Sequence, residues 1–267
     1  MAGRPIRMAF RMVTRERKIG GGCSLLLEVQ NLSKRFGGLQ AVKGLIFGAE
    51  EGEILGLIGP NGAGKTTVFN LITGVYAPDS GVIRFEGKSI AGLKSYQICI
   101  KGICRTFQIA QPFREMTVLK NVMTGSFSRT ADVEEAKRKA EEVLDFAGLG
   151  GKKDILAKEL TAIDQRRLEV ARALATDPRL LLLDETMAGL NPKECDEAVS
   201  LINKIRDKGV TVIMVEHVVK VIMSLCKRII VLDYGTKIAE GKPEEIRSNE
   251  NVIKAYLGGE YRRAIRQ

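Results

Sequence analysis

A glycine-rich segment that follows an apolar run has the composition of a phosphate-binding loop. It reads G-x-x-x-x-G-K-T and comprises Gly59, Pro60, Asn61, Gly62, Ala63, Gly64, Lys65, Thr66 and Thr67. Glycines let backbone N–H groups curl around phosphate oxygens, and the N-terminus of a following helix adds partial positive charge. In such loops the lysine contacts the β- and γ-phosphates and the first threonine hydroxyl binds Mg²⁺. The segment therefore predicts a site for a nucleoside triphosphate and Mg²⁺.

Two carboxylates follow another apolar run further along the chain. Four leucines at 180–183 end in Asp184 and Glu185. Ligands of open α/β sheets bind outside the carboxyl ends of the strands, so these side chains are expected near the phosphate loop. Asp184 is expected to help hold Mg²⁺, partly through water, and Glu185 to orient and polarise the attacking water. A solvated strand end is the alternative, and the phosphate loop upstream argues against it.

Strand-like and helical patterns alternate after residue 24. Strand-like runs lie at 25–29, 53–58, 81–85, 180–184, 210–215 and 229–232. The last three are almost continuously apolar, which is typical of strands buried on both faces of a parallel sheet. Helical patterns lie at 68–73, 131–147, 162–175 and 192–209. The alternation predicts an α/β fold around a P-loop NTPase core, and the helix-rich stretch 94–174 is predicted to be inserted between its halves.

Composition excludes several classes of protein. The 267 residues are 45% hydrophobic and 28% charged, which excludes a disordered chain, a collagen and a coiled coil. The longest apolar runs are far shorter than the roughly 18 residues that span a bilayer. The five cysteines include no C-x-x-C pair, so neither a zinc site nor a redox dithiol is indicated.

The net charge of +10 is unevenly distributed. Residues 1–24 carry six basic residues and one acidic residue, which is half of the excess. We expect a basic, disordered extension there, or a start of translation at Met8 or Met12, and a short basic tail at 259–267. The extension lacks the apolar region of a signal peptide, so secretion is not expected. The remaining charge is ordinary for a protein of this size and does not favour nucleic acid as the partner.

Three further motifs narrow the class of P-loop protein. Thr106-Phe107-Gln108 lies between the phosphate loop and the acidic pair, L-T-x-x-x-Q-R-R-L-E begins at Leu160, and His217 follows the run 210–215. A guanine-specific N-K-x-D motif is absent. In this order the motifs resemble the nucleotide-binding subunit of ABC transporters over residues 25–258, and most of all that of branched-chain amino-acid (Liv-type) importers. The runs that carry the similarity are 105–108, 113–118, 171–178, 188–192 and 215–217.

The resemblance implies an organisation of the chain. A RecA-like nucleotide-binding core is expected at 25–93 and 175–258, with an antiparallel β subdomain at its N-terminal end. A helical subdomain is expected at 94–174.

The resemblance also implies roles for single residues. Phe36 stands at the aromatic position that stacks on adenine, and Val42 is expected beside it. Gln108 is expected to contact Mg²⁺ and water, and His217 the γ-phosphate. Thr161 is expected to contact the ATP that a partner subunit holds. Without the resemblance, Phe36 would be interpreted equally well as a core aromatic residue.

The signature loop departs from the family sequence L-S-G-G-Q. Thr161 keeps the hydroxyl, but Ile163 replaces a glycine at a point where the backbone must approach phosphate closely. Asp164 adds negative charge. Thr161 and Asp164 also have the spacing of a capping box, so the helix start is expected to survive. We expect a weakened signature face, which suits a heterodimer with two unequal sites.

The function that the resemblance implies is ATP hydrolysis that powers the import of branched-chain amino acids or a related small polar solute. The implied partners are a second ABC ATPase subunit in a homo- or heterodimer, two membrane-spanning permease subunits and, indirectly, an extracytoplasmic solute-binding protein. The implied location is peripheral, at the cytoplasmic face of the membrane. Two alternatives are a catalytically weakened partner subunit and a non-transport ABC ATPase acting on nucleic acid. The single cassette argues against the second, so no nucleic acid is expected.

Overall fold

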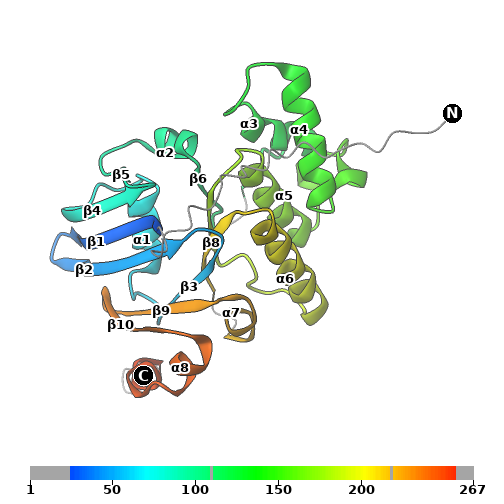
Figure 1. Cartoon of the computed structure of the whole chain (residues 1–267). Helices are drawn as coiled ribbons and strands as arrows, with labels where there is room; N and C mark the ends of the chain where they lie inside the picture. Colours follow the sequence, from blue (N-terminus) through cyan, green and yellow to red (C-terminus); the bar gives the residue numbers. More distant parts are fainter. Residues whose placement is uncertain (1–24, 109–110, 217–218, 257–267) are drawn as a thin grey trace, which may run out of the picture.

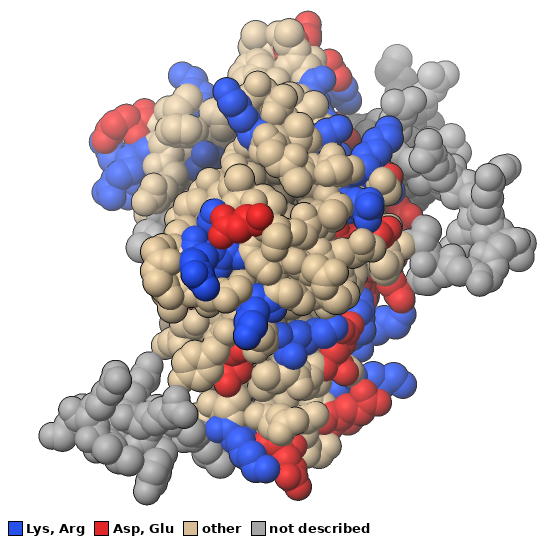
Figure 2. Space-filling view, turned by 90° about the vertical axis from the view of Figure 1, so that its left-hand side faces the viewer, with Lys and Arg blue, Asp and Glu red and all other residues tan. Residues whose placement is uncertain are grey.

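An antiparallel sheet forms one side of the molecule. The computed structural model describes residues 25–108, 111–216 and 219–256. Four strands lie in the order β2-β1-β4-β5: β1 (Leu25–Phe36), β2 (Leu39–Glu50), β4 (Ser80–Phe85) and β5 (Lys88–Ser89). The sheet lies on the left in Figure 1. On this side of the molecule, basic and acidic side chains are interspersed (Figure 2), and they include the ion pair of Lys34 with Asp79 at 2.7 Å.

A second sheet runs through the centre of the molecule. Its neighbouring strands are parallel except for β10, which pairs antiparallel with β9. The order is β10 (Thr236–Gly241), β9 (Arg228–Asp233), β3 (Ile54–Ile58), β8 (Thr211–Val215), β7 (Leu180–Asp184) and β6 (Ile103–Arg105). Because β3 and β7 are parallel to β8, which lies between them, their carboxyl ends lie at the same edge of the sheet.

The helices pack on both faces of this sheet. α1 follows β3, α5 precedes β7, and α6 connects β7 to β8 (Figure 1). The helices are α1 (Lys65–Ile72), α2 (Ser95–Lys101), α3 (Val118–Ser126), α4 (Val133–Phe146), α5 (Ala162–Leu174), α6 (Pro192–Asp207), α7 (Val219–Leu225) and α8 (Pro243–Ser248). Each helix among the described residues is too short or too polar to cross a bilayer.

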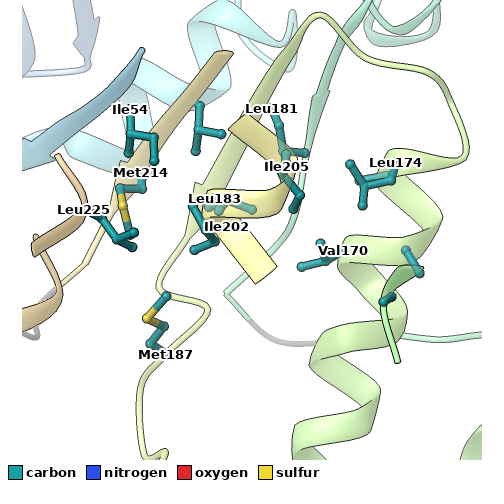
Figure 3. Close-up of a cluster of buried hydrophobic side chains, with 14 of the residues drawn as sticks. Ile54, Val170, Leu174, Leu181, Leu183, Met187, Ile202, Ile205, Met214 and Leu225 are labelled. Atoms are coloured by element: carbon teal, nitrogen blue, oxygen red, sulfur yellow. The ribbon is translucent and has the colours of Figure 1, made fainter. Parts of the chain in front are cut away.

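Alternate leucines of β7 belong to two different cores. Leu180 and Leu182 pack with α1 and the antiparallel sheet. Leu181 and Leu183 pack on the other face with residues of α5 and α6, including Val170 and Ile202 (Figure 3). All four are fully buried. The run is continuously apolar because both faces of this strand are covered by other elements, as was expected.

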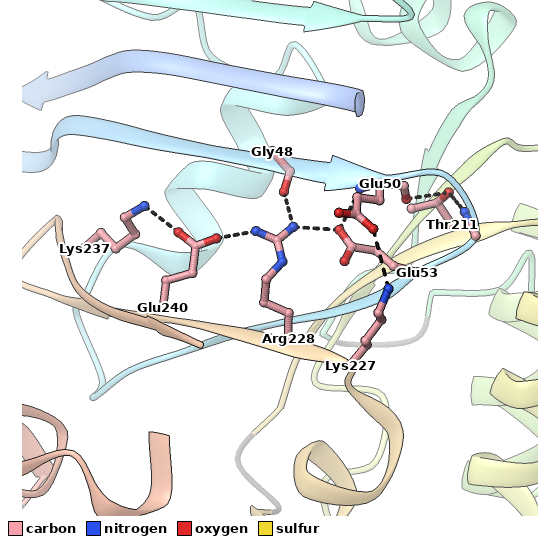
Figure 4. Close-up of polar contacts among 9 residues, drawn as sticks. Gly48, Glu50, Glu53, Thr211, Lys227, Arg228, Lys237 and Glu240 are labelled. Atoms are coloured by element: carbon pink, nitrogen blue, oxygen red, sulfur yellow. Dashed lines mark hydrogen bonds and ion pairs between the residues drawn. The ribbon is translucent and has the colours of Figure 1, made fainter. Parts of the chain in front are cut away.

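A partly buried charge network ties the two sheets together. The Arg228 guanidinium at the start of β9 donates to the carbonyl oxygen of Gly48 in β2 at 2.6 Å and pairs with Glu53 at 2.8 Å (Figure 4). It also pairs with Glu240 of β10, which Lys237 contacts in turn. The half-buried Arg228 therefore has partners on both sheets, as a charge removed from water requires.

The predicted fold class is confirmed: the described residues form an α/β structure with a mainly parallel core and an antiparallel N-terminal sheet. Four strands were not predicted, namely β2, β5, β6 and β10. The correction matters most for β6, because it lies inside the stretch 94–174 and pairs with β7 of the central sheet. It has only three residues, too few to give a periodic signal. The predicted extension at 1–24 and tail at 259–267 lie outside the described residues.

Candidate nucleotide-binding site

The phosphate loop connects β3 to α1 and is held from behind by close backbone packing. A Cβ atom on Gly59 would lie 2.1 Å from the carbonyl oxygen of Leu232, and one on Gly64 would lie 2.4 Å from that of Ala41. Gly64 also has a left-handed backbone with φ of 103°. Glycine is therefore required at both positions. Thr66, in the first turn of α1, is exposed at the surface.

Lys65 is buried and directed back onto its own loop. Its ammonium group donates to the carbonyl oxygens of Gly59 at 2.7 Å and Pro60 at 3.0 Å. Burial lowers the pKa of Lys65, and the negative charges of Glu185 and Asp184 oppose this effect. The structure thus brings the lysine of the loop and the two predicted carboxylates into one electrostatic group.

Asp184 ends β7 in a nearly dry environment, with 1% of its surface exposed. Arg105 at the end of β6 pairs with one of its carboxylate oxygens at 3.0 Å. The backbone N–H of Asp184 donates to the hydroxyl of Thr106 at 3.2 Å. Burial raises the pKa of Asp184, while Arg105 and Lys65 act in the opposite direction.

Glu185 adopts an unusual backbone and touches the predicted glutamine. Its φ of 50° lies in the left-handed region, which non-glycine residues rarely occupy. Its N–H donates to the carbonyl oxygen of Val215 at 2.8 Å, which fixes this turn to the end of β8. The Gln108 amide donates to the Glu185 carboxylate at 2.6 Å. Strain of this kind is typical of functional sites.

The segment that carries Gln108 is anchored to α5. The buried carboxylate of Glu169 accepts from the N–H of Phe107 at 3.3 Å and from that of Gln111 at 3.2 Å. Arg172 donates to the carbonyl oxygen of Gln111 at 3.1 Å. The helix that follows the signature loop thus holds the glutamine segment in place.

Two further predicted contacts with the nucleotide meet different outcomes. The Phe36 ring is 40% exposed and lies edge-on to Tyr76, with ring centroids 5.1 Å apart. Its exposed surface leaves room for stacking. Val42, in contrast, is fully buried, so its side chain is not available to a nucleotide in this structure. The expectation for Val42 is corrected: it packs in the core of the antiparallel sheet.

His217 lies outside the described residues, but its neighbour Glu216 does not. The Glu216 carboxylate is buried and accepts from the N–H of Met187 at 2.9 Å and the hydroxyl of Thr186 at 3.3 Å. It therefore ties the turn that leads to His217 to the turn after Glu185. Glu216 belongs to the run 215–217, but no role was predicted for it.

In the signature loop the predicted helix cap is present, and the negative charge of Asp164 is neutralised by neighbouring basic residues. The hydroxyl of Thr161 accepts from the N–H of Asp164 at 3.3 Å and donates to the Asp164 carboxylate at 2.9 Å. That carboxylate is buried, contacts the Lys152 ammonium and lies 3.8 Å from Arg167. The expected negative charge at Asp164 is therefore neutralised within the chain. Ile163 lines a small apolar hollow with Met187 and Leu190.

The donor set suits a metal ion that arrives with a nucleotide. The described residues contain no cluster of three or more His, Cys, Asp or Glu side chains that could hold a metal alone. Mg²⁺ commonly binds through one or two protein oxygens together with phosphate oxygens and water. Thr66, at the start of α1, and Asp184, at the end of β7, offer such oxygens.

Sequence reasoning did not assign a role to Arg105 or Glu169. Arg105 was noted only as part of the run 105–108, and Glu169 only as part of the signature segment. Arg105 follows the apolar run Ile103-Cys104, whereas Glu169 lies among the arginines 166, 167 and 172 and does not stand out in the sequence. Their partners, however, lie 79 positions away for Arg105 and 58 and 62 positions away for Glu169.

The model of the ABC transporter family matches residues 42–188, and the model of the branched-chain amino acid ATP-binding cassette transporter matches residues 236–262. The high-affinity branched-chain amino acid transport ATP-binding protein BraF of Pseudomonas aeruginosa is 44% identical over 251 residues, covering 87% of this chain and 98% of that protein. The protein LivG of Escherichia coli, with the same description, is 44% identical over 249 residues, with the same shares covered.

A solved structure agrees with these similarities. An ATP-binding cassette of an ABC transporter in its ADP conformation superposes with a TM-score of 0.81 at 30% identity. The match covers 88% of this chain and 99% of that one.

Proposed function

This chain belongs to the ABC transporter family, and from that membership we propose that it hydrolyses ATP between its phosphate loop and β7 to power the import of branched-chain amino acids. An ATP-binding subunit of this family is an ATPase coupled to transport. The observation that carries the proposed site is the bond from Gln108 to Glu185 beside Asp184 and the buried Lys65.

Each residue of the site has its own role in the proposed ATP hydrolysis. Lys65 leaves its loop carbonyls and contacts the phosphates, while backbone N–H groups from Gly59 to Thr67 surround them. Thr66 and Asp184 would hold Mg²⁺, which would supply positive charge to the phosphoryl group as it is transferred. Gln108 fixes the Glu185 carboxylate, which accepts a proton from the attacking water. We expect His217, which follows the buried Glu216 in the sequence, to contact the γ-phosphate.

The solute is proposed from the chain's relatives. Both curated proteins described above are named for branched-chain amino acid transport, and the second family model covers the C-terminal part of this chain. We expect proteoliposomes with the assembled transporter to accumulate labelled leucine only when ATP and Mg²⁺ are enclosed. Uptake of urea without uptake of leucine, isoleucine or valine would contradict the solute assignment but not the ATPase.

The partners follow from the same proposal. We expect the signature loop, whose Thr161 caps its own helix, to contact the nucleotide held by a second ATPase subunit, as the family membership implies. ATP hydrolysis is coupled to conformational changes of two membrane-spanning permease subunits, and an extracytoplasmic binding protein delivers the solute. The chain then lies peripherally at the cytoplasmic face of the membrane.

Replacing Ile163 with glycine is expected to raise the ATPase rate of the assembled transporter. The side chain of Ile163 stands where family members carry glycine, and the backbone there must approach phosphate. The negative charge of Asp164 no longer contributes to this argument, because Lys152 neutralises it. Phosphate release by the complex measures the effect.

Val133→Gly is the control for this prediction. It likewise replaces a β-branched residue with glycine in the first turn of a helix, but Val133 begins α4, outside the signature loop, and is 57% exposed. The ATPase rate of Val133→Gly should equal that of wild type. Equal rates for wild type and Ile163→Gly would show that Ile163 does not weaken the signature face.

A further inference from the structure

Arg105 occupies a buried position between three elements of the nucleotide-binding core. Its guanidinium donates to the Asn70 side chain of α1 at 2.5 Å and pairs with the Asp184 carboxylate of β7 at 3.0 Å. It also donates to the carbonyl oxygen of Thr106 at 3.2 Å. The side chains of Arg105 and Asp184 are 8% and 2% exposed, so this is an ion pair removed from water.

Two aromatic rings restrain the guanidinium group of Arg105. The guanidinium lies 4.6 Å from the centroid of the Phe107 ring and 5.9 Å from that of Phe69. Planar guanidinium groups stack on such rings and present several donors in a fixed plane, which an ammonium group cannot do. The rings therefore restrain the orientation of the guanidinium plane, which carries its positive charge toward Asp184.

The two elements that Arg105 joins each carry a proposed Mg²⁺ ligand, Thr66 on α1 and Asp184 on β7. α1 begins with Lys65 and Thr66 and presents Asn70 one turn later, and β7 ends at Asp184. The guanidinium bridges Asn70 and Asp184 directly. Thr106 adds a second restraint, because its hydroxyl accepts the backbone N–H of Asp184.

We propose that Arg105 is a positioning residue for the metal site: it holds the Asp184 carboxylate by one oxygen and sets its place relative to α1. The proposal rests on the proposed role of Asp184 in binding Mg²⁺. The second carboxylate oxygen is thereby left for the ion or its water ligands. Residues that orient metal ligands in this way typically change metal affinity 10- to 100-fold when they are replaced.

The position of Arg105 in the chain gives the proposal a second consequence. Arg105 lies three residues before Gln108, which bonds to Glu185 next to Asp184. The same short segment thus contacts both carboxylates of the site. A displacement of this segment would reach Asp184 through Arg105 and Glu185 through Gln108.

The test is a titration of the full-length protein with Mn²⁺ in the presence of a non-hydrolysable ATP analogue, with free Mn²⁺ followed by electron paramagnetic resonance. We expect Arg105→Met to weaken Mn²⁺ binding at least about tenfold. Binding of the analogue without metal should change little, because Arg105 does not contact the phosphate loop. Arg105→Lys should show an intermediate loss, since an ammonium group cannot bridge Asn70 and Asp184 together.

Arg228→Met is the matched control. Arg228 is also a partly buried arginine that pairs with a buried carboxylate, that of Glu53 at 2.8 Å, and donates to a backbone carbonyl, that of Gly48 at 2.6 Å. It lies at the start of β9, at the edge of the sheet opposite to the end of β7 that carries Asp184. Its replacement should leave the Mn²⁺ affinity close to that of wild type, whatever it does to stability.

The outcomes separate this inference from the proposed function. Mn²⁺ binding by Arg105→Met at wild-type affinity, with an unchanged circular dichroism spectrum, would overturn the positioning role alone. An equal loss in Arg228→Met would also overturn it, because the effect would then be a general loosening of the fold. If Arg105→Met does not fold, wild-type affinity in Arg105→Lys decides against the inference. Absence of nucleotide-linked Mn²⁺ binding in the wild type would refute both the metal role of Asp184 and this inference.

Discussion

Glu185→Gln is expected to reduce steady-state ATP hydrolysis on the order of 10²- to 10⁴-fold while ATP binding remains. An amide has nearly the shape of a carboxylate but cannot accept the proton of the attacking water. It can still meet Gln108, whose amide donates to this side chain at 2.6 Å in the wild type. Phosphate release by the assembled transporter measures turnover, and equilibrium binding of a fluorescent ATP analogue measures affinity.

A control for this variant is Glu142→Gln. Glu142 lies on the exposed face of α4 and pairs only with Arg138 of the same helix among the described residues, at 3.4 Å. Its replacement should leave both turnover and binding unchanged. Hydrolysis at the wild-type rate in Glu185→Gln would show that another group activates the water.

The strained backbone of Glu185 makes this assignment more specific. Its φ of 50° and its bond to Val215 of β8 place the side chain just beyond the end of the sheet, where Gln108 reaches it. A left-handed residue that is neither glycine nor asparagine costs on the order of 1–3 kcal/mol. Glutamine should accept this conformation as well as glutamate does, so the variant is not expected to lose stability.

The sequence was sufficient for those parts of the site whose residues are neighbours in the chain. The phosphate loop and the acidic end of β7 each sit in one local segment, and the strand–loop–helix order places them at the same edge of the sheet. The cap formed by Thr161 was predictable for the same reason, because a helix start involves residues three positions apart.

The sequence was not sufficient where a side chain meets a distant partner. Asp164 was expected to add negative charge to the signature loop, but Lys152 from the segment before it neutralises this charge. Val42 was placed beside adenine from its position in the family pattern, whereas packing of the antiparallel sheet buries it. The role of Arg105 depends on Asp184 and Asn70, which belong to other elements.

Lys65→Met is expected to weaken ATP binding roughly 10- to 100-fold, because a charge-assisted hydrogen bond contributes about 1.5–3 kcal/mol and each 1.4 kcal/mol is a factor of ten. Methionine keeps the length of the side chain and removes its charge. Equilibrium binding of a fluorescent ATP analogue in the presence of Mg²⁺ measures the loss. Lys227→Met provides the control, since Lys227 is 75% exposed and lies at the start of β9, away from the loop.

The melting temperature of Lys65→Met without nucleotide is a second measurement, and it is not expected to fall although ATP binding is weakened. Burial lowers the pKa of Lys65, which means that the folded protein holds this ammonium group at a cost in free energy. Its two hydrogen bonds to Gly59 and Pro60 offset part of that cost. Removing the charge should therefore leave the melting temperature of the nucleotide-free protein unchanged or higher, while the stabilisation that ATP gives to the wild type is lost. A variant that melts earlier and still binds ATP at wild-type affinity would show that Lys65 supports the loop and not the phosphates.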